Sequence, residues 1–86
     1  MYNPLMEQLI QKLEVTLIQY GGMIPYHRLT SIFRREMNAA MVKDVVATAV
    51  TVGILLDEKL LYRDSRRIRT FRYICLPEWA DYETAE

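Results

Sequence analysis

Apolar residues in the first twenty positions recur at steps of three and four. This spacing is typical of a helix with one apolar stripe, and the polar residues between fall mostly on its other side. Asn3 is a natural N-cap, and Pro4 suits the first helical position because its missing N–H needs no partner there. Gly21-Gly22 ends the pattern, so we expect a first helix over residues 3–20. The stripe consists of Leu5, Met6, Leu9, Ile10, Leu13, Leu17 and Tyr20.

The same spacing returns twice more. A short extended link with a proline, residues 23–25, leads into a second predicted helix over 26–37. Asn38 is a natural cap before a third predicted helix over 39–52, which Gly53 ends. The expected inward residues are Leu29, Ile32, Phe33 and Met37 in the second helix, and Val42, Val45, Val46 and Ala49 in the third.

After Gly53 the pattern becomes that of extended chain. Residues 59–63 and 68–76 are rich in apolar and aromatic side chains with basic ones interleaved, and Asp64-Ser65-Arg66-Arg67 suits a tight turn between them. We therefore predict an antiparallel hairpin, which Pro77 ends, and an α+β fold of three helices followed by that hairpin. The predicted domain covers residues 1–77, and residues 78–86 form an acidic tail.

Composition narrows the class of protein. The chain has 86 residues, enough for one domain, and 51% of them are hydrophobic, which is enough for a globular core. So high a fraction in so small a domain leaves some apolar surface exposed, a first indication of a protein contact.

Charge is unevenly distributed along the chain. The formal net charge is zero, yet residues 63–72 contain five arginines and one acid, whereas residues 78–86 contain four acids and no base. A surface can be strongly positive on a neutral protein, so the total does not exclude an anionic partner.

Candidate chemistry is sparse. Cys75 is the only cysteine, which excludes an internal disulfide and fits a small core residue, and the lone His27 is no metal site. We find no phosphate loop, paired metal ligands or nucleophile elbow, and so expect no enzyme, no cofactor and no metal.

Targeting signals are also missing from the pattern. The longest apolar run, residues 45–56, is shorter than the roughly 20 residues of a membrane span, and no leader precedes a cleavage site. With Met1 at the start, we expect a complete cytoplasmic chain without a membrane partner.

The order helix, helix, turn, helix, hairpin resembles the winged helix-turn-helix superfamily over residues 3–76. The most telling stretch is the end of the third predicted helix, where Val42, Val45, Val46 and Ala49 precede Gly53 and Ile54 at the start of the hairpin. The resemblance implies a three-helix core with a C-terminal hairpin wing. It also implies a DNA-binding protein, such as a small transcriptional regulator, whose third helix enters the major groove of double-stranded DNA.

In such proteins the wing touches phosphates or the minor groove. Arginine suits phosphate because its several donors reach two oxygens at once. The wing candidates are Arg66, Arg67 and Arg69, with Arg63 and Arg72 beside them on the strands. The alternative is a solvated hairpin whose arginines keep an edge strand soluble.

The third predicted helix offers few groups that read bases. Lys43 could reach a guanine or a phosphate, Thr48 could touch a thymine methyl group, and Asn38 could bind DNA or only cap the helix. The outward face of this helix, with its small and apolar side chains, or the first helix, equally suits a protein-interaction module built on the same scaffold. The expected outward residues are Ala40, Met41, Lys43, Asp44, Ala47 and Thr48.

Arg34 and Arg35, late in the second predicted helix, could touch phosphates, or could belong to a solvated face beside Glu36.

The apolar stripe of the first helix is wider than one contact needs. Leu5, Val15 and Ile18 are our candidates for a two-fold homodimer contact, unless the hairpin or the Trp79 segment covers them. The acidic tail could also shield the wing.

Overall fold

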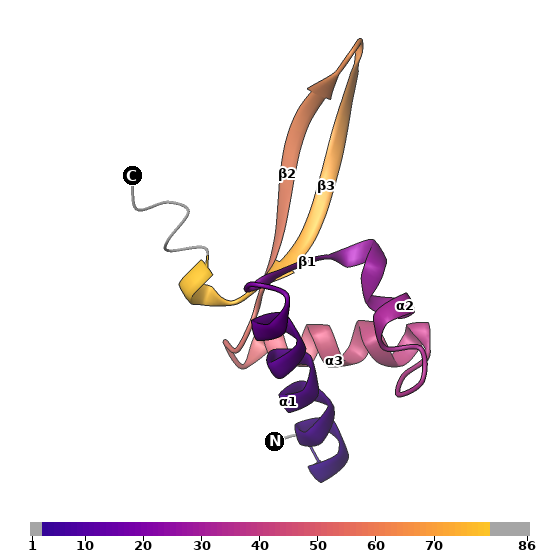
Figure 1. Cartoon of the computed structure of the whole chain (residues 1–86), viewed down its shortest axis with the longest axis vertical. Helices are drawn as coiled ribbons and strands as arrows, with labels where there is room; N and C mark the ends of the chain where they lie inside the picture. The colour runs from indigo at the N-terminus through magenta and orange to yellow at the C-terminus, as the bar shows by residue number, and fades with distance from the viewer. Residues whose placement is uncertain (1–2, 80–86) are drawn as a thin grey trace.

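The computed structural model describes residues 3–79, which form a mixed α+β fold with a three-stranded antiparallel sheet in the order β1-β3-β2 (Figure 1). In chain order the elements are helix α1 (Pro4–Gln19), strand β1 (Met23–Pro25), the 3-10 turn η1 (Tyr26–Arg28), helix α2 (Leu29–Ile32), helix α3 (Ala39–Thr51), strand β2 (Leu56–Asp64) and strand β3 (Arg67–Cys75).

The first and third predicted helices are confirmed to within a residue at each end. The side-chain oxygen of Asn3 accepts a hydrogen bond from the Met6 N–H at 2.8 Å, and that of Asn38 accepts one from Met41 at 2.9 Å. Each bond satisfies one of the N–H groups that a helix start leaves without a partner. These caps set where α1 and α3 begin.

The predicted second helix over 26–37 is wrong as a continuous helix. α2 is a single turn that ends at Ile32, and residues 33–36 are turns in which the Phe33 carbonyl accepts from both Glu36 and Met37. Thr30, Ser31 and Ile32 are weak helix formers, because branched or hydroxyl side chains disfavour helical backbone. The apolar spacing still reports burial correctly, as Leu29, Phe33 and Met37 are buried and Ile32 is partly buried.

The hairpin is confirmed, with longer strands than predicted. β2 and β3 pair from Leu56↔Cys75 to Asp64↔Arg67, so only Ser65 and Arg66 form the loop. Ser65 has a φ of +55°. A positive φ is what the first residue of a two-residue hairpin loop adopts in a type II′ turn.

The predicted extended link at residues 23–25 is a strand. β1 pairs with the base of β3 only, from Met23↔Cys75 to Pro25↔Tyr73. The sheet therefore has three strands near the helices and two beyond them.

The core lies where α1 and α3 pack with the base of the sheet and the α2 segment. All of its buried side chains are apolar, and no polar side chain is buried in the described part of the chain. The inward residues predicted for α3 are all buried. The core comprises Ile10, Leu13, Leu17, Ile24, Leu29, Phe33, Met37, Val42, Val45, Val46, Ala49, Leu55 and Ile74.

Cys75 also lies in the interior, at the end of β3. Burial, with a smaller contribution from the Glu58 carboxylate, raises the pKa of its thiol to about 11. The prediction of a small core residue is confirmed.

The tyrosines of the described chain lie at the rim of the core or outside it. Tyr20 and Tyr62 are exposed, and Tyr26 and Tyr73 are only partly buried. A phenol tolerates water at its hydroxyl end, so a tyrosine at the rim loses little by staying there.

Trp79, the last described residue, packs against Gly22. Gly22 is buried with a φ of +103°, and a Cβ there would lie 3.0 Å from the Trp79 Cδ1 atom. The indole also meets the Tyr73 ring edge-on, with 5.6 Å between ring centroids. The predicted acidic tail begins at Glu78 and otherwise falls on residues 80–86, outside the described residues.

The hairpin extends well beyond the helices. Every residue from 59 to 70 is exposed, and this part of the hairpin runs along the molecule's 45 Å dimension (Figure 1). Across residues 3–79, no helix combines the length and apolar character needed to cross a membrane.

Candidate nucleic-acid interface

Residues 59–70, here called the arm, carry most of the arginines predicted to bind DNA. Because cross-strand partners lie on the same face of a ribbon, the register divides the arm into two faces. We call them the Leu61 face and the Leu60 face. The Leu61 face carries Lys59, Leu61, Arg63, Ile68 and Thr70, and the Leu60 face carries Leu60, Tyr62, Asp64, Arg67 and Arg69.

Arg72 lies at the base of the arm and is held there by two neighbours. Its Nε and Nη2 atoms donate to the two Asp57 carboxylate oxygens at 3.0 and 2.6 Å. Its guanidinium also lies over the Tyr26 ring, 3.7 Å from the centroid. Hydrogen bonding to Asp57 raises the pKa of Arg72, so this group stays charged while it ties β3 to β2 and η1.

The remaining arginines of the hairpin differ in their partners. Arg69 pairs with Asp64, with 2.9 Å between Nε and Oδ2. Arg63, Arg66 and Arg67 form no ion pair with any residue between 3 and 79. Three exposed guanidinium groups near the tip of the arm are therefore available to an external anion.

A hollow of about 290 Å³ lies between α3 and the base of the hairpin. Lys43 lines this hollow from α3, next to Arg72 and Asp57, which form an ion pair with each other. Lys43 is therefore the charged residue of the lining that has no ion-pair partner among residues 3–79. The rest of the helix surface here is small and apolar, which lets a ligand approach the backbone closely. The lining residues are Tyr26, Lys43, Val46, Ala47, Val50, Asp57 and Arg72.

The other predicted residues of α3 are placed less favourably. Thr48 is partly buried, and the Asn38 side chain is engaged in capping Met41. The other residues of α3 that were expected to face outward are exposed, apart from Met41, which is partly buried.

Arg34 and Arg35 are exposed, but they lie in the turns after α2 and not on a helix. Glu36, expected beside them, instead pairs with Lys12 of α1 at 3.1 Å. The two arginines therefore sit on an irregular segment that leads into α3.

The candidate dimer residues do not form one patch. Val15 and Ile18 are 53% and 61% exposed and are neighbours at a three-residue step on α1. Leu5 is about ten residues earlier, which is roughly 15 Å along a helix axis. Neither the hairpin nor Trp79 covers these residues, since all three are exposed.

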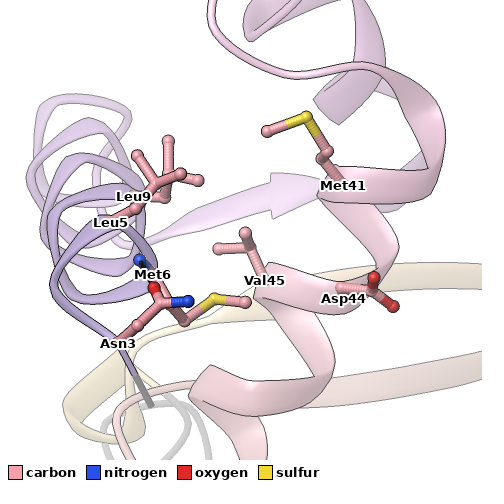
Figure 2. Close-up of a pocket in the computed structure, with 7 residues that line it drawn as sticks. All are labelled: Asn3, Leu5, Met6, Leu9, Met41, Asp44 and Val45. Carbon is pink, nitrogen blue, oxygen red and sulfur yellow. Dashed lines mark hydrogen bonds between the residues drawn. The ribbon is translucent and has the colours of Figure 1, made fainter.

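Leu5 belongs instead to a second hollow, of about 120 Å³, between the first turns of α1 and α3. Figure 2 shows Met6 and Met41 extending from their own helices toward the opposite helix, with Val45 between them, whereas the Asp44 side chain points away from α1. The lining of the hollow is mostly apolar, and its polar members are Asn3 and Asp44. Among residues 3–79, no cluster of His, Cys, Asp or Glu could hold a metal ion.

Sequence reasoning missed the exposed apolar side chains of the arm and the partners of Arg72. Leu61 and Ile68 are 67% and 70% exposed, more than any other large hydrophobic residue of the described chain. Asp57 could have been found, because a two-residue loop at Ser65-Arg66 sets a register that places it diagonally across from Arg72.

No protein-family model, no curated protein and no solved structure matches this chain.

Proposed function

We propose that this protein binds double-stranded DNA as a winged helix, with α3 in the major groove and the arm as the wing. The observation that carries the proposal is the set of three exposed arginines, Arg63, Arg66 and Arg67, on an arm that stands clear of the body. None of them forms an ion pair with a residue from 3 to 79. A small DNA-binding regulator is the role that such a module would serve.

The arm is suited to phosphate. A guanidinium without an internal partner gives up only water when it binds a phosphate, and each contact releases counterions from the duplex. Arg69 and Arg72 must exchange an existing carboxylate partner, so we assign them smaller contributions.

α3 is suited to close approach more than to base readout. Lys43 is the side chain on its exposed face that can reach a phosphate or a guanine, and Ala47 leaves the backbone accessible. Thr48, Asn38, Arg34 and Arg35 are proposed as further contacts near this helix. Most of the binding energy should then be independent of sequence.

We also propose that the protein acts as a homodimer through Val15 and Ile18. Both are exposed, and among their neighbours on the outer side of α1 are the uncharged Gln8, Gln11 and Gln19. A two-fold axis there would present two arms and two α3 helices to a duplex.

The second candidate is a protein-interaction module, favoured by the apolar hollow of Figure 2 and by the small side chains of α3. Salt separates the two candidates. Binding through phosphates weakens steeply with salt, whereas an apolar interface changes little.

The deciding experiment is a fluorescence-anisotropy titration of a labelled random duplex at several salt concentrations. Each bound protomer should make three to four phosphate contacts. The logarithm of the affinity per protomer should then fall with the logarithm of salt at a slope of about −3, or roughly sixtyfold between 50 and 200 mM. Arg66→Ala with Arg67→Ala should reduce that slope by about 2 and weaken binding at low salt.

The matched control is Arg66→Lys with Arg67→Lys, which keeps both charges at the exposed tip of the arm and should retain binding to within a few fold. An absence of binding at low salt would contradict the proposal. So would binding that the alanine variant leaves unchanged.

A further inference from the structure

The Leu61 face of the arm combines the most exposed apolar side chains of the described chain with unpaired charge. Leu61 and Ile68 are 67% and 70% exposed, and they line a small surface depression together with Arg63 and Tyr62. In the register Ile68 lies opposite Arg63, and Leu61 is two residues from Arg63 on the same strand. The two apolar side chains are therefore diagonal neighbours, close to the tip.

This pair does not serve the fold. Within residues 3–79, β1 pairs with residues 73–75 alone, and beyond them nothing in this part of the chain adds a third strand or a second layer to the arm. A two-stranded ribbon is marginal in water by itself, and apolar side chains this exposed gain nothing until another molecule covers them.

Charge indicates what kind of molecule covers them. Arg63 adjoins the pair on the same face and Arg66 is in the loop, while Arg67 precedes Ile68 on β3 but belongs to the Leu60 face. None of the three has an ion-pair partner among residues 3–79. The occupant therefore presents apolar surface set within negative charge. The minor groove of DNA fits this description, since its deoxyribose walls, and the base faces of a step once it is opened, lie between two rows of phosphates.

The length of the arm agrees with that site. Its six paired positions on β2, residues 59–64, extend about 20 Å at 3.3 Å per residue. A major groove and the next minor groove along a duplex are about 17 Å apart, half of a turn of roughly 34 Å. An arm that starts beside α3 in the major groove thus ends at the flanking minor groove.

With the arm tip in the minor groove, as the resemblance implies for a wing, we infer that Leu61 and Ile68 act as an apolar wedge against a base step and bend the duplex. This inference rests on the proposed DNA-binding function and deepens it. The arginines hold the flanking phosphates, while the wedge unstacks the bases and turns the DNA away from the arm, toward the major groove. Flexible pyrimidine–purine steps should be preferred, because they unstack most easily.

The test is ring closure by DNA ligase of a duplex of about 100 bp, which is shorter than the persistence length of about 150 bp and closes slowly unless bent. We expect the wild-type protein to accelerate closure by about tenfold or more. Leu61→Thr with Ile68→Thr should abolish the acceleration, while affinity measured by anisotropy stays within about threefold, because the arginines remain.

Leu60→Thr is the matched control. Leu60 is 55% exposed on the same strand but belongs to the opposite face, so its substitution should leave ring closure unchanged. Both substitutions replace exposed residues with a good strand former, and circular dichroism of each variant checks that the hairpin persists.

Binding without accelerated closure would overturn the wedge and leave DNA binding standing. Full acceleration by the Leu61/Ile68 variant, or equal loss in Leu60→Thr, would also overturn it. Self-association without DNA that disappears in the Leu61/Ile68 variant would assign the pair to a protein contact instead. Failure of the wild type to bind DNA at low salt would remove the proposed function itself.

Discussion

Arg66 and Arg72 have the same side chain but different surroundings. Arg72 is held by two hydrogen bonds to Asp57 and by the ring of Tyr26, whereas Arg66 lies in the exposed loop with no ion-pair partner among residues 3–79. Residue type alone made both of them candidates for phosphate. Partners supplied by the fold distinguish an arginine that stabilises the hairpin base from one that is free to bind an anion.

The burial of Cys75 lowers the reactivity of its thiol. A pKa raised from 9.0 to about 11 leaves about a hundredfold less thiolate at any pH below 9, and the thiolate is the reactive form. We expect Ellman's reagent at pH 8 to react with the native protein at least about a hundredfold more slowly than with protein in guanidinium.

Because Cys75 is the only cysteine, the signal has a single source. Raising the pH toward 11 should speed the native reaction, since more of the thiol ionises. Comparable rates in native and denatured protein at pH 8 would show that the thiol is not buried as described.

Among the helices and strands, those defined by interactions between near neighbours in sequence were predicted correctly, and those that depend on distant residues were not. α1 and α3 begin at asparagine caps whose bonds join residues three apart, and the loop at Ser65-Arg66 joins adjacent strands. Such features are visible in the sequence because all their partners lie within a few residues. The α2 segment and β1 depend on packing and pairing with distant residues, and there the predicted helix and the predicted link were wrong or incomplete.

Asn38 provides the test at this scale, since both capping and DNA contact were expected of it. Asn38→Ala should lower the free energy of unfolding by about 1 kcal/mol, because the Met41 N–H loses its acceptor. Asn38→Ser, which can still cap, should stay close to the wild type. Urea denaturation followed by circular dichroism measures both.

If Asn38→Ala leaves stability unchanged but weakens DNA binding tenfold, the residue is a DNA contact and its cap is dispensable.

For the whole molecule, a net charge of zero conceals a division into parts. The arm carries Lys59 and four arginines against Asp64, so the remainder of the chain has an excess of acids. This division favours an anionic partner at the arm and leaves the helices for other contacts. On α1, Val15 and Ile18 are the exposed apolar neighbours that such a contact would cover.

Sedimentation equilibrium tests the proposed homodimer. We expect the wild type to approach twice the chain mass as concentration rises, because burying Val15 and Ile18 removes apolar surface from water. Val15→Lys with Ile18→Lys should remain monomeric.

The control is Val52→Lys, at an exposed position beyond the end of α3, which should dimerise like the wild type. A wild type that stays monomeric at all concentrations would contradict the α1 interface.

By itself the sequence determined the α+β class, helices α1 and α3 with their caps, the buried side of α3 and the turn of the hairpin. Each follows from periodicity or from a bond between near neighbours, which the order of residues already contains. Only the tertiary structure decided that α2 is one turn, that β1 joins the sheet, and that Arg72 is held by Asp57 and Tyr26. The same holds for Leu61 and Ile68, which stand in solvent. These features depend on which distant segments meet and on how far the hairpin outreaches the helices, and no local pattern encodes either.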